Sequence, residues 1–217
     1  MSQTIYMTPE KIYGGREEVK LRISAILKLN PDAKILDIGA AWNPLEEATH
    51  TFDFNEFQSK SVHKFTGNIN DYEDWIQIFD YVDQFGKFDF CNCTHTLEDL
   101  AYPQAALKYM PRIAKEGFVA VPSKYYELQR RELYRGATHH RWIFSGKDNV
   151  LVGYPKLNLI DYVNYQPSSK IEHYGNTELR IMWSDTIDWT IINNDYMGPS
   201  KEAIDQMFLD LFYGSEI

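Results

Sequence analysis

Apolar residues recur every three or four positions in three segments of the chain, which is the spacing of an amphipathic helix. Residues 15–30 place Val19 and Ile23 on one face between charged residues, and an Asn-Pro pair ends the pattern. Residues 71–85 and 103–114 repeat the spacing, the second of them opening with a proline. The sequence therefore predicts three helices that each pack one face on a core.

Short apolar runs lie before and between these helices and predict buried strands. The runs are residues 33–39, 49–54, 62–67, 88–93 and 118–121. Strands that alternate with helices predict an α/β fold, a Rossmann-like and mostly parallel sheet flanked by helices, in which ligands bind beyond the carboxyl ends of the strands.

The pattern changes after the fifth run. Residues 124–136 are polar, basic and rich in tyrosine, and residues 178–183 and 187–192 are strand-like, which predicts a late antiparallel pair at the edge of the sheet. No repeat or long linker interrupts the chain. We expect one domain over residues 1–217, with its α/β core at 33–123, an insertion at 124–170, and edge strands and a C-terminal segment at 171–217.

Charge and composition exclude several classes of function. The net charge is −9, from 22 Lys and Arg against 31 Asp and Glu, which repels a nucleic-acid backbone. The two cysteines, in a Cys-Asn-Cys run, supply neither a disulfide framework nor paired zinc ligands, so we expect a cytoplasmic protein. We expect no membrane span and no leader peptide. The sequence does not indicate an oligomeric state.

Residues 35–44, Ile-Leu-Asp-Ile-Gly-Ala-Ala-Trp-Asn-Pro, resemble the first motif of class I S-adenosylmethionine (SAM)-dependent methyltransferases, a strand that ends in acid-x-Gly-x-Gly-x-Gly. Residues 88–100 are similar to the fourth-strand signature of that family, a Phe-Asp strand followed by a His-x-Leu-Glu turn, and residues 112–117 match an Arg-x-x-Lys-x-Gly helix end. The resemblance covers about residues 33–123. It implies a class I methyltransferase fold whose core binds the cofactor and whose insertion recognises the acceptor.

The resemblance implies a cofactor site at the ends of the first, second, third and fourth strands. A glycine lets the backbone approach a ligand, and an acid at the end of the second strand can accept both hydrogens of a ribose diol. The implied cofactor-binding residues are Asp37, Gly39, Ala40, Ala41, Trp42, Asn43, Asp53, Phe54, Asn68, Ile69, Thr94 and His95.

Three positions depart from the family pattern. Ala41 and Asn43 replace glycines of the first loop, and Asn68 replaces an acid that contacts adenine, although its carbonyl can still accept from the adenine amine. The connection from this loop to Asp53 is also short, so we expect a turn or a very short helix there. For any one glycine and acid, the alternative interpretation is a turn glycine and strand-end caps.

The sequence lacks the motifs that bind other cofactors and the motif that presents a nucleophilic serine. The Gly-x-Gly-x-x-Gly fingerprint of dinucleotide binding, the phosphate-binding Gly-x-x-x-x-Gly-Lys-Ser/Thr loop and the Gly-x-Ser-x-Gly nucleophile turn are all missing. We expect Cys91 and Cys93 to be small buried side chains.

Methyl transfer to oxygen needs a base near the cofactor, and His95 is in that place by its order in the chain. Glu98 and Asp99 can orient His95, hold the acceptor or bind a divalent cation, so a metal is left open. The alternatives are that His95 lines the cofactor and packs on the sheet, and that the acids begin a helix at the surface.

His139 and His140 form the other candidate catalytic pair, followed by an arginine and a tryptophan. Resembling sequences with a Pro-Ser after the fifth strand and a later His-His-Arg-Trp segment are associated with surface-glycan synthesis, which implies a sugar hydroxyl as acceptor. Two further sets fit such an acceptor: aromatic faces for a sugar ring, at Tyr125, Tyr126, Tyr134 and Trp142, and basic residues for a nucleotide-linked sugar, at Lys124, Arg130, Arg131 and Arg135. The alternatives are a hydrogen-bonded structural histidine pair and a solvated helix face.

The resemblance thus implies a SAM-dependent O-methyltransferase that acts on a small hydroxylated acceptor, a sugar or glycan. Two alternatives stay open: a SAM-binding or non-catalytic protein with an assembly or regulatory role, and a methyltransferase of proteins or nucleic acids. The acidic balance and the missing Asn/Asp-Pro-Pro-Tyr/Phe signature disfavour the nucleic-acid version.

Overall fold

The computed structural model describes residues 2–8, 17–40, 43–55, 63–131, 133–164, 177–192 and 200–214. They form two compact units. Unit 1 consists of Met1–Gln3, Lys11–Val119 and Met182–Ile187, and unit 2 of Thr4–Glu10, Ala120–Ile181 and Asp188–Ile217. The single domain over residues 1–217 stays a prediction.

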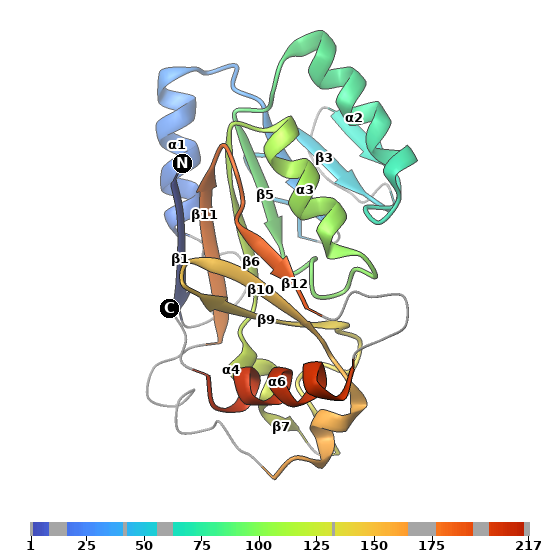
Figure 1. The fold of residues 1–217 in the computed structure, drawn as a ribbon. Helices are drawn as coiled ribbons and strands as arrows, with labels where there is room; N and C mark the ends of the chain where they lie inside the picture. The colour runs from blue at the N-terminus through green and yellow to red at the C-terminus, as the bar shows by residue number, and fades with distance from the viewer. Residues whose placement is uncertain are drawn as a thin grey trace. The chain divides into compact units, whose positions relative to one another are not determined.

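The largest sheet has seven strands in the order β1-β11-β6-β5-β2-β3-β4 (Figure 1). Its strands are β1 (Ser2–Thr8), β2 (Ile35–Ile38), β3 (His50–Asp53), β4 (His63–Thr66), β5 (Phe90–Thr94), β6 (Glu116–Pro122) and β11 (Glu178–Ser184). β2 pairs in parallel with β3 and β5, and β3 pairs in parallel with β4. Taken in chain order, the five strands from β2 to β6 are arranged 3-2-1-4-5, which is the doubly wound order of Rossmann-like sheets. The predicted α/β class is confirmed.

Three helices of unit 1 match the predicted amphipathic segments: α1 (Glu17–Leu29), α2 (Tyr72–Phe85) and α3 (Pro103–Ile113). Asp71 caps α2 by accepting from the backbone N–H of Glu73, and Pro103 opens α3. α2 and α3 lie side by side (Figure 1), joined by ring contacts of Tyr109 with Tyr72 and Phe79. α2 connects β4 to β5 and α3 connects β5 to β6, so their packing joins two successive connections of the sheet.

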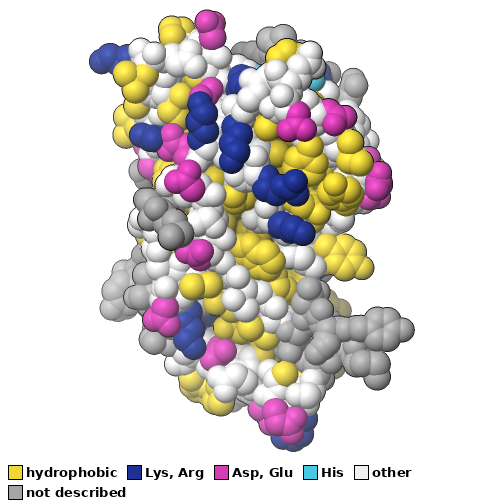
Figure 2. All heavy atoms as spheres, turned by 45° about the horizontal axis from the view of Figure 1, so that its top comes forward, with side chains coloured by type: hydrophobic (Ala, Val, Ile, Leu, Met, Phe, Trp, Pro, Cys, Tyr) yellow, Lys and Arg dark blue, Asp and Glu magenta, His cyan; other side chains and the backbone are white. Residues whose placement is uncertain are grey.

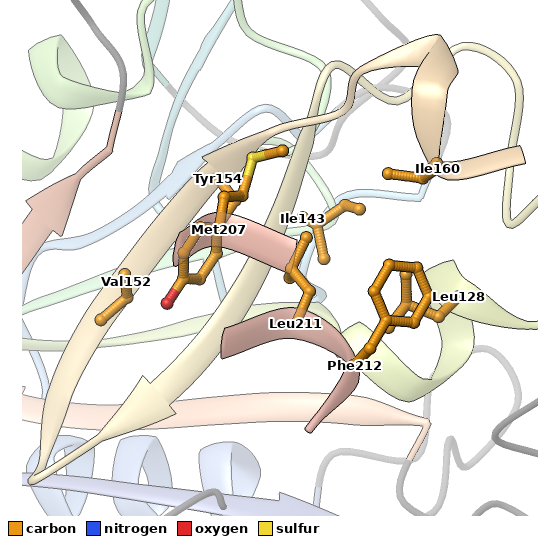
Figure 3. Close-up of a cluster of buried hydrophobic side chains, with 8 residues drawn as sticks. All are labelled: Leu128, Ile143, Val152, Tyr154, Ile160, Met207, Leu211 and Phe212. Carbon is orange, nitrogen blue, oxygen red and sulfur yellow. The ribbon is translucent and has the colours of Figure 1, made fainter. Parts of the chain in front are cut away.

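Unit 2 contains a three-stranded sheet of β9 (Trp142–Lys147), β10 (Val150–Pro155) and β12 (Trp189–Ile191). Around it lie α4 (Lys124–Leu128), β7 (Arg130–Arg131), β8 (Tyr134–Arg135), the 3₁₀ helix η1 (Asn158–Tyr162) and α6 (Lys201–Phe212). Their core is a cluster of Leu128, Ile143, Val152, Tyr154, Ile160, Met207, Leu211 and Phe212 (Figure 3).

Several elements of the structure differ from the sequence prediction. The strand-like run at 178–183 becomes β11, which lies between β6 and β1, and β12 pairs in parallel with β10 instead of with β11. The predicted antiparallel edge pair is therefore wrong, because the two runs lie in different sheets and do not pair with each other. β1, the β9–β10 hairpin and α6 were not predicted. None of the described helices is both long and apolar enough to cross a bilayer.

Candidate functional site

Hydrogen bonds beyond the strand ends hold three neighbouring loops of unit 1 together. The backbone N–H of Gly39, after β2, donates to the Phe52 carbonyl at 2.9 Å, and the N–H of Gly67, after β4, donates to the Asp53 carbonyl at 2.9 Å. Because the strands are parallel, their carboxyl ends lie at one edge of the sheet. The loops after β2, β3 and β4 therefore start side by side.

A pocket of about 320 Å³ opens at this edge of unit 1. It is lined by residues from four segments of the chain: Gly39, Asp53 and Phe54, Asn68 to Asn70, and His95, Thr96, Asp99 and Leu100. The volume is within the range of small-molecule sites. A single cavity thus joins residues that follow each of the four strands at whose ends the resemblance implies a cofactor site.

Position 39 requires glycine for two reasons, its backbone conformation and a neighbouring side chain. Its φ is +69°, and a Cβ at this position would lie 2.1 Å from Oγ1 of Thr96. A residue with a side chain would therefore be strained and would collide with the turn after β5. Glycine at this position therefore allows the loop after β2 and the turn after β5 to pack closely together.

Asp37 is buried rather than presented to the pocket. Its Oδ1 accepts from the Asn92 amide at 2.7 Å, and its Oδ2 accepts from the backbone N–H of Leu45 at 2.7 Å. The Asp37 carboxylate therefore joins the loop after β2, at Leu45, to Asn92 of the neighbouring strand β5. Asp37 is not among the described residues that line the pocket, and its direct contact with a cofactor stays a prediction.

The segment after β4 is held by its own hydrogen bonds. The backbone N–H of Asn68 donates to Asp74 at 2.7 Å, and Asn68 Oδ1 accepts from the Asn70 side chain at 2.9 Å. Asn70 Oδ1 in turn accepts from the backbone N–H of Tyr102, which joins this segment to the start of α3. The Asn68 carbonyl, expected to accept from an adenine amine, is already used within the protein.

His95 lies on the turn after β5 with a left-handed backbone, φ 50°. Its Nδ1 is 3.3 Å from Oε1 of Glu98, and the two side chains are 37% and 2% exposed. A buried carboxylate on one ring nitrogen favours the tautomer that leaves the other nitrogen, Nε2, as an acceptor. The turn continues to Asp99, whose backbone N–H donates to the Thr96 carbonyl. His95 can therefore act as a base at the pocket.

The charge of the pocket is acidic. Among the described residues that line it, Asp53 and Asp99 are carboxylates and none is Lys or Arg. A phosphate or pyrophosphate group would meet no cation there, whereas a positively charged ligand would be attracted. This agrees with the missing dinucleotide fingerprint.

The predicted residues that line the pocket are Gly39, Asp53, Phe54, Asn68, Ile69 and His95; those that do not are Asp37, Ala40, Asn43, Thr94 and Glu98. Ala41 and Trp42 lie outside the described residues. Asn70, Thr96 and Leu100 also line the pocket and were not predicted. Their nearness to Asn68 and His95 in the chain is the only signal that could have indicated them.

His139 and His140 belong to unit 2. His140 Nδ1 lies 2.6 Å from Oε1 of Glu127, and the fully buried Glu127 also binds Lys156 Nζ at 2.6 Å through its other oxygen. The two histidine rings meet edge to face at 4.5 Å. This geometry fits the structural alternative for His140, a hydrogen-bonded member of a buried ion cluster. Its catalytic role stays a prediction.

Two basic residues proposed for an anionic acceptor are instead used inside unit 2. Lys124 is buried and donates to the carbonyls of Asp210 and Gly214 at the end of α6. Arg135 is buried and donates to the carbonyls of Leu128, Ile160 and Val163. Neither is available to a phosphate, so this expectation is wrong for both. On the face shown in Figure 2, several Lys and Arg side chains gather in the upper part of the view, beside acidic and hydrophobic side chains.

The aromatic residues proposed for a sugar also separate by burial. Trp142 and Tyr125 are buried, whereas Tyr126 is half-buried and Tyr134 is 55% exposed. Trp142 and Tyr125 therefore present no free ring face to an acceptor, and the expectation is wrong for them. Cys91 and Cys93 are buried and not in a disulfide, as expected, and burial raises the pKa of the Cys91 thiol.

No protein-family model matches the sequence, and no curated protein matches it either. Among solved structures, similarity is found to the N-terminal domain of EvdMO1 with S-adenosylhomocysteine (SAH) bound, at 12% identity and a TM-score of 0.33, over 76% of this chain and 64% of that one. The small RNA methyltransferase HEN1 gives 12% identity and a TM-score of 0.37, over 84% of this chain and 27% of that one. A cyclopropane-fatty-acyl-phospholipid synthase-like protein from Lactobacillus casei ATCC 334 gives 16% and 0.36, over 82% and 96%.

The chain thus spans about two thirds of the EvdMO1 domain and about a quarter of HEN1. At these values the similarity identifies neither a reaction nor a substrate.

Proposed function

We propose that the protein is a SAM-dependent methyltransferase that transfers a methyl group to a hydroxyl of a small acceptor. One observation carries the proposal: a single pocket of unit 1 is lined by residues from the ends of all four strands at which the resemblance to class I methyltransferases implies a cofactor site. The pocket lies beyond the carboxyl ends of a doubly wound sheet, where such folds bind their ligands.

The pocket fits SAM better than a dinucleotide. Its lining contains Asp53 and Asp99 and, among the described residues, neither Lys nor Arg. SAM carries an ammonium and a sulfonium against one carboxylate, whereas a dinucleotide carries a pyrophosphate. The local charge therefore favours SAM.

Individual residues fit parts of the cofactor. Asp53, at the end of β3, can accept both hydrogens of a ribose diol. Phe54 is 65% exposed and offers a ring face to a heterocycle, with Ile69 as a second apolar surface. Gly39 presents backbone without a side chain in the way.

When bound, SAM supplies an electrophilic methyl group, and its transfer to a hydroxyl leaves SAH and one proton. His95 accepts that proton from the acceptor oxygen at Nε2, because Nδ1 is directed to Glu98 at 3.3 Å. Glu98 is buried and stabilises the imidazolium that forms. Glu98 acts through His95 and is a positioning residue.

We propose a sugar or glycan as the acceptor. The support is the segment around His139 and His140, which resembles sequences associated with surface-glycan synthesis, and the exposed ring of Tyr134, which suits the C–H face of a sugar. Glycan acceptors should be screened first, with small phenols as the comparison.

Calorimetric titration with SAM and SAH, with NAD as a control, tests the proposal. We expect micromolar binding of SAM and SAH and none of NAD, and Asp53→Ala should lose the binding because the ribose acceptor is removed. Absence of SAM and SAH binding would contradict the proposal and favour the non-catalytic alternative. Unchanged affinity in Asp53→Ala would show that the end of β3 does not hold the ribose.

A further inference from the structure

The neighbouring helices α2 and α3 of unit 1 carry opposite charges. α2 has four acids and no Lys or Arg, whereas α3 has two basic residues, Lys108 and Arg112, and no Asp or Glu. Both helices are described over their whole length. Because α2 and α3 lie side by side (Figure 1), unit 1 has one face with an acidic half and a basic half.

The acidic half is a row of three exposed residues on α2, Glu73, Asp80 and Asp83. Asp83 lies four residues beyond Phe79, and a spacing of four places both on one side of the helix. Phe79 is the ring that contacts Tyr109 of α3, so this side of α2 borders α3. Glu73 and Asp80 are seven residues apart, which is two turns, and continue the row along the helix. The row therefore lies on the solvent side of α2, next to α3.

An aromatic seam of Tyr72, Phe79 and Tyr109 separates the acidic row from the two basic residues. The ring centroid of Tyr109 lies 5.8 Å from that of Tyr72 and 5.4 Å from that of Phe79, and Tyr72 is 49% exposed. The Arg112 guanidinium lies 4.6 Å from the centroid of Phe79. Lys108 Nζ lies 5.6 Å from that of Tyr109. These cation–π contacts hold both basic side chains beside the aromatic seam.

The acidic and basic residues lie at matching levels along the two helices. Arg112 lies over the ring of the residue before Asp80. Tyr109, which follows Lys108, contacts the ring of the residue before Glu73. A rotation of 180° about an axis along the aromatic seam keeps each level and exchanges the two halves of the face. The face is therefore complementary in charge to a second copy of itself, as a two-fold interface requires.

We propose that this face of α2 and α3 is a dimer interface that binds a second copy of the chain about a two-fold axis along the aromatic seam. A second copy supplies an acidic and a basic half together, at the matching level, whereas a uniformly charged partner would fit one half and be repelled by the other. Exposed tyrosine and arginine side chains are typical of such interfaces. The proposal does not depend on the methyltransferase activity.

The size of the face predicts a weak and reversible dimer. α2 and α3 have 14 and 11 residues, so the face is about 20 Å long and about 20 Å wide. A dimer would bury roughly 800 Å² in total, which is the size of transient interfaces. We expect sedimentation velocity on the full chain, from about 1 to 500 μM, to show a shift from monomer to dimer, with a dissociation constant on the order of 10–100 μM.

Two charge-reversed variants test the interface. In Lys108→Glu/Arg112→Glu both helices carry acids, and in Asp80→Lys/Asp83→Lys both carry basic residues. We expect each variant alone to stay monomeric over the whole concentration range, because like charges face each other across the two-fold axis. An equimolar mixture should form a heterodimer at least as tight as the wild-type dimer, and this recovery also shows that both variants are folded.

A matched control reverses two exposed lysines on other elements, Lys28 of α1 and Lys147 of β9. Lys28→Glu/Lys147→Glu changes the net charge as much as the α3 variant does, and it should dimerise like the wild type. A wild-type protein that is monomeric over the whole range would overturn the proposal. So would a dimer that neither reversed variant weakens, or two monomeric variants whose mixture forms no heterodimer.

Discussion

At the scale of single residues, the pocket depends on backbone conformations that few side chains adopt. Both His95 and Gly39 have positive φ, at 50° and 69°. Such positions bring two loops close together and re-aim a side chain toward the cavity. A substitution that tests the side chain at either position must use a residue that can adopt a positive φ.

His95→Asn tests the base without changing the backbone, because asparagine tolerates the left-handed conformation. We expect turnover to fall by about 10² to 10⁴, the usual contribution of a general base, with SAM affinity changed less than about threefold. Steady-state kinetics and calorimetry on the same preparation measure both. Equal loss of affinity and turnover would mean that His95 serves mainly to bind the cofactor.

Gly39→Ala tests the contact between the loops after β2 and β5. The new Cβ would lie 2.1 Å from Thr96 Oγ1, at a φ of 69°. We expect the free energy of unfolding to fall by about 2 kcal/mol or more, measured by urea denaturation. Adding Thr96→Ala should restore part of the loss, whereas additive losses in the double variant would rule out the clash as its cause.

At the scale of elements, an aromatic cluster joins β3, β4 and α2 at the amino ends of the strands. His50 is 7% exposed and lies between Thr49 Oγ1, at 2.8 Å from Nδ1, and Tyr81 Oη, at 2.7 Å from Nε2. His63 and Phe88 complete the cluster, with ring centroids 5.4 Å and 5.0 Å from that of His50. His50 is therefore a structural residue, remote from the carboxyl ends that form the pocket.

This cluster makes stability depend on pH. Burial, with the nearby charges of His63 and Lys34, lowers the pKa of His50 from 6.5 to about 4. Above pH 6.5 the residue is neutral in the folded and unfolded chain. Between pH 6.5 and 4 only the unfolded chain gains the proton, so stability falls by up to about 3 kcal/mol as the pH drops.

Urea denaturation at pH 7.5 and pH 4.5 measures this effect. We expect His50→Gln to lose much less stability than the wild type between these two values, and His139→Gln, an exposed histidine, to behave like the wild type. A wild-type pH dependence that persists in His50→Gln would assign the effect to other groups.

The elements also show how far the sequence predicts the fold. The helices α1, α2 and α3 and the strands β2 to β6 were predicted within two residues, because the helices repeat apolar residues every three or four positions and most of the strands are compact apolar runs. The β9–β10 hairpin was missed since its turn, Asp148 and Asn149 with φ of 50° and 60°, lacks the glycine that usually marks such turns. β1 was missed because a strand at the edge of a sheet has no strong pattern of its own.

At the scale of the whole molecule, we expect ligand binding to raise stability and to slow hydrogen exchange at the carboxyl ends of the strands. We expect SAM, at a hundred times its dissociation constant, to raise the free energy of unfolding by about 2.7 kcal/mol. Hydrogen exchange should slow around Gly39, Asp53, Asn68 and His95, while α1 keeps its rates. Uniform slowing over unit 1, or protection at the amino ends of the strands, would place the ligand elsewhere.

The sequence by itself determined the order of helices and strands and, through the alternation of β and α segments, the doubly wound sheet with its strand ends at one edge. That order also determined that Gly39, Asp53, Asn68 and His95 would come near one another, because parallel strands bring successive carboxyl ends together.

Only the tertiary structure decided how each polar group is used. Asp37, the Asn68 carbonyl, Lys124 and Arg135 are all bound within the protein, which local patterns cannot reveal, because a buried polar group takes whatever partner the packing brings to it. The same holds for β11 and β12, whose neighbours depend on which sheet edge each strand meets.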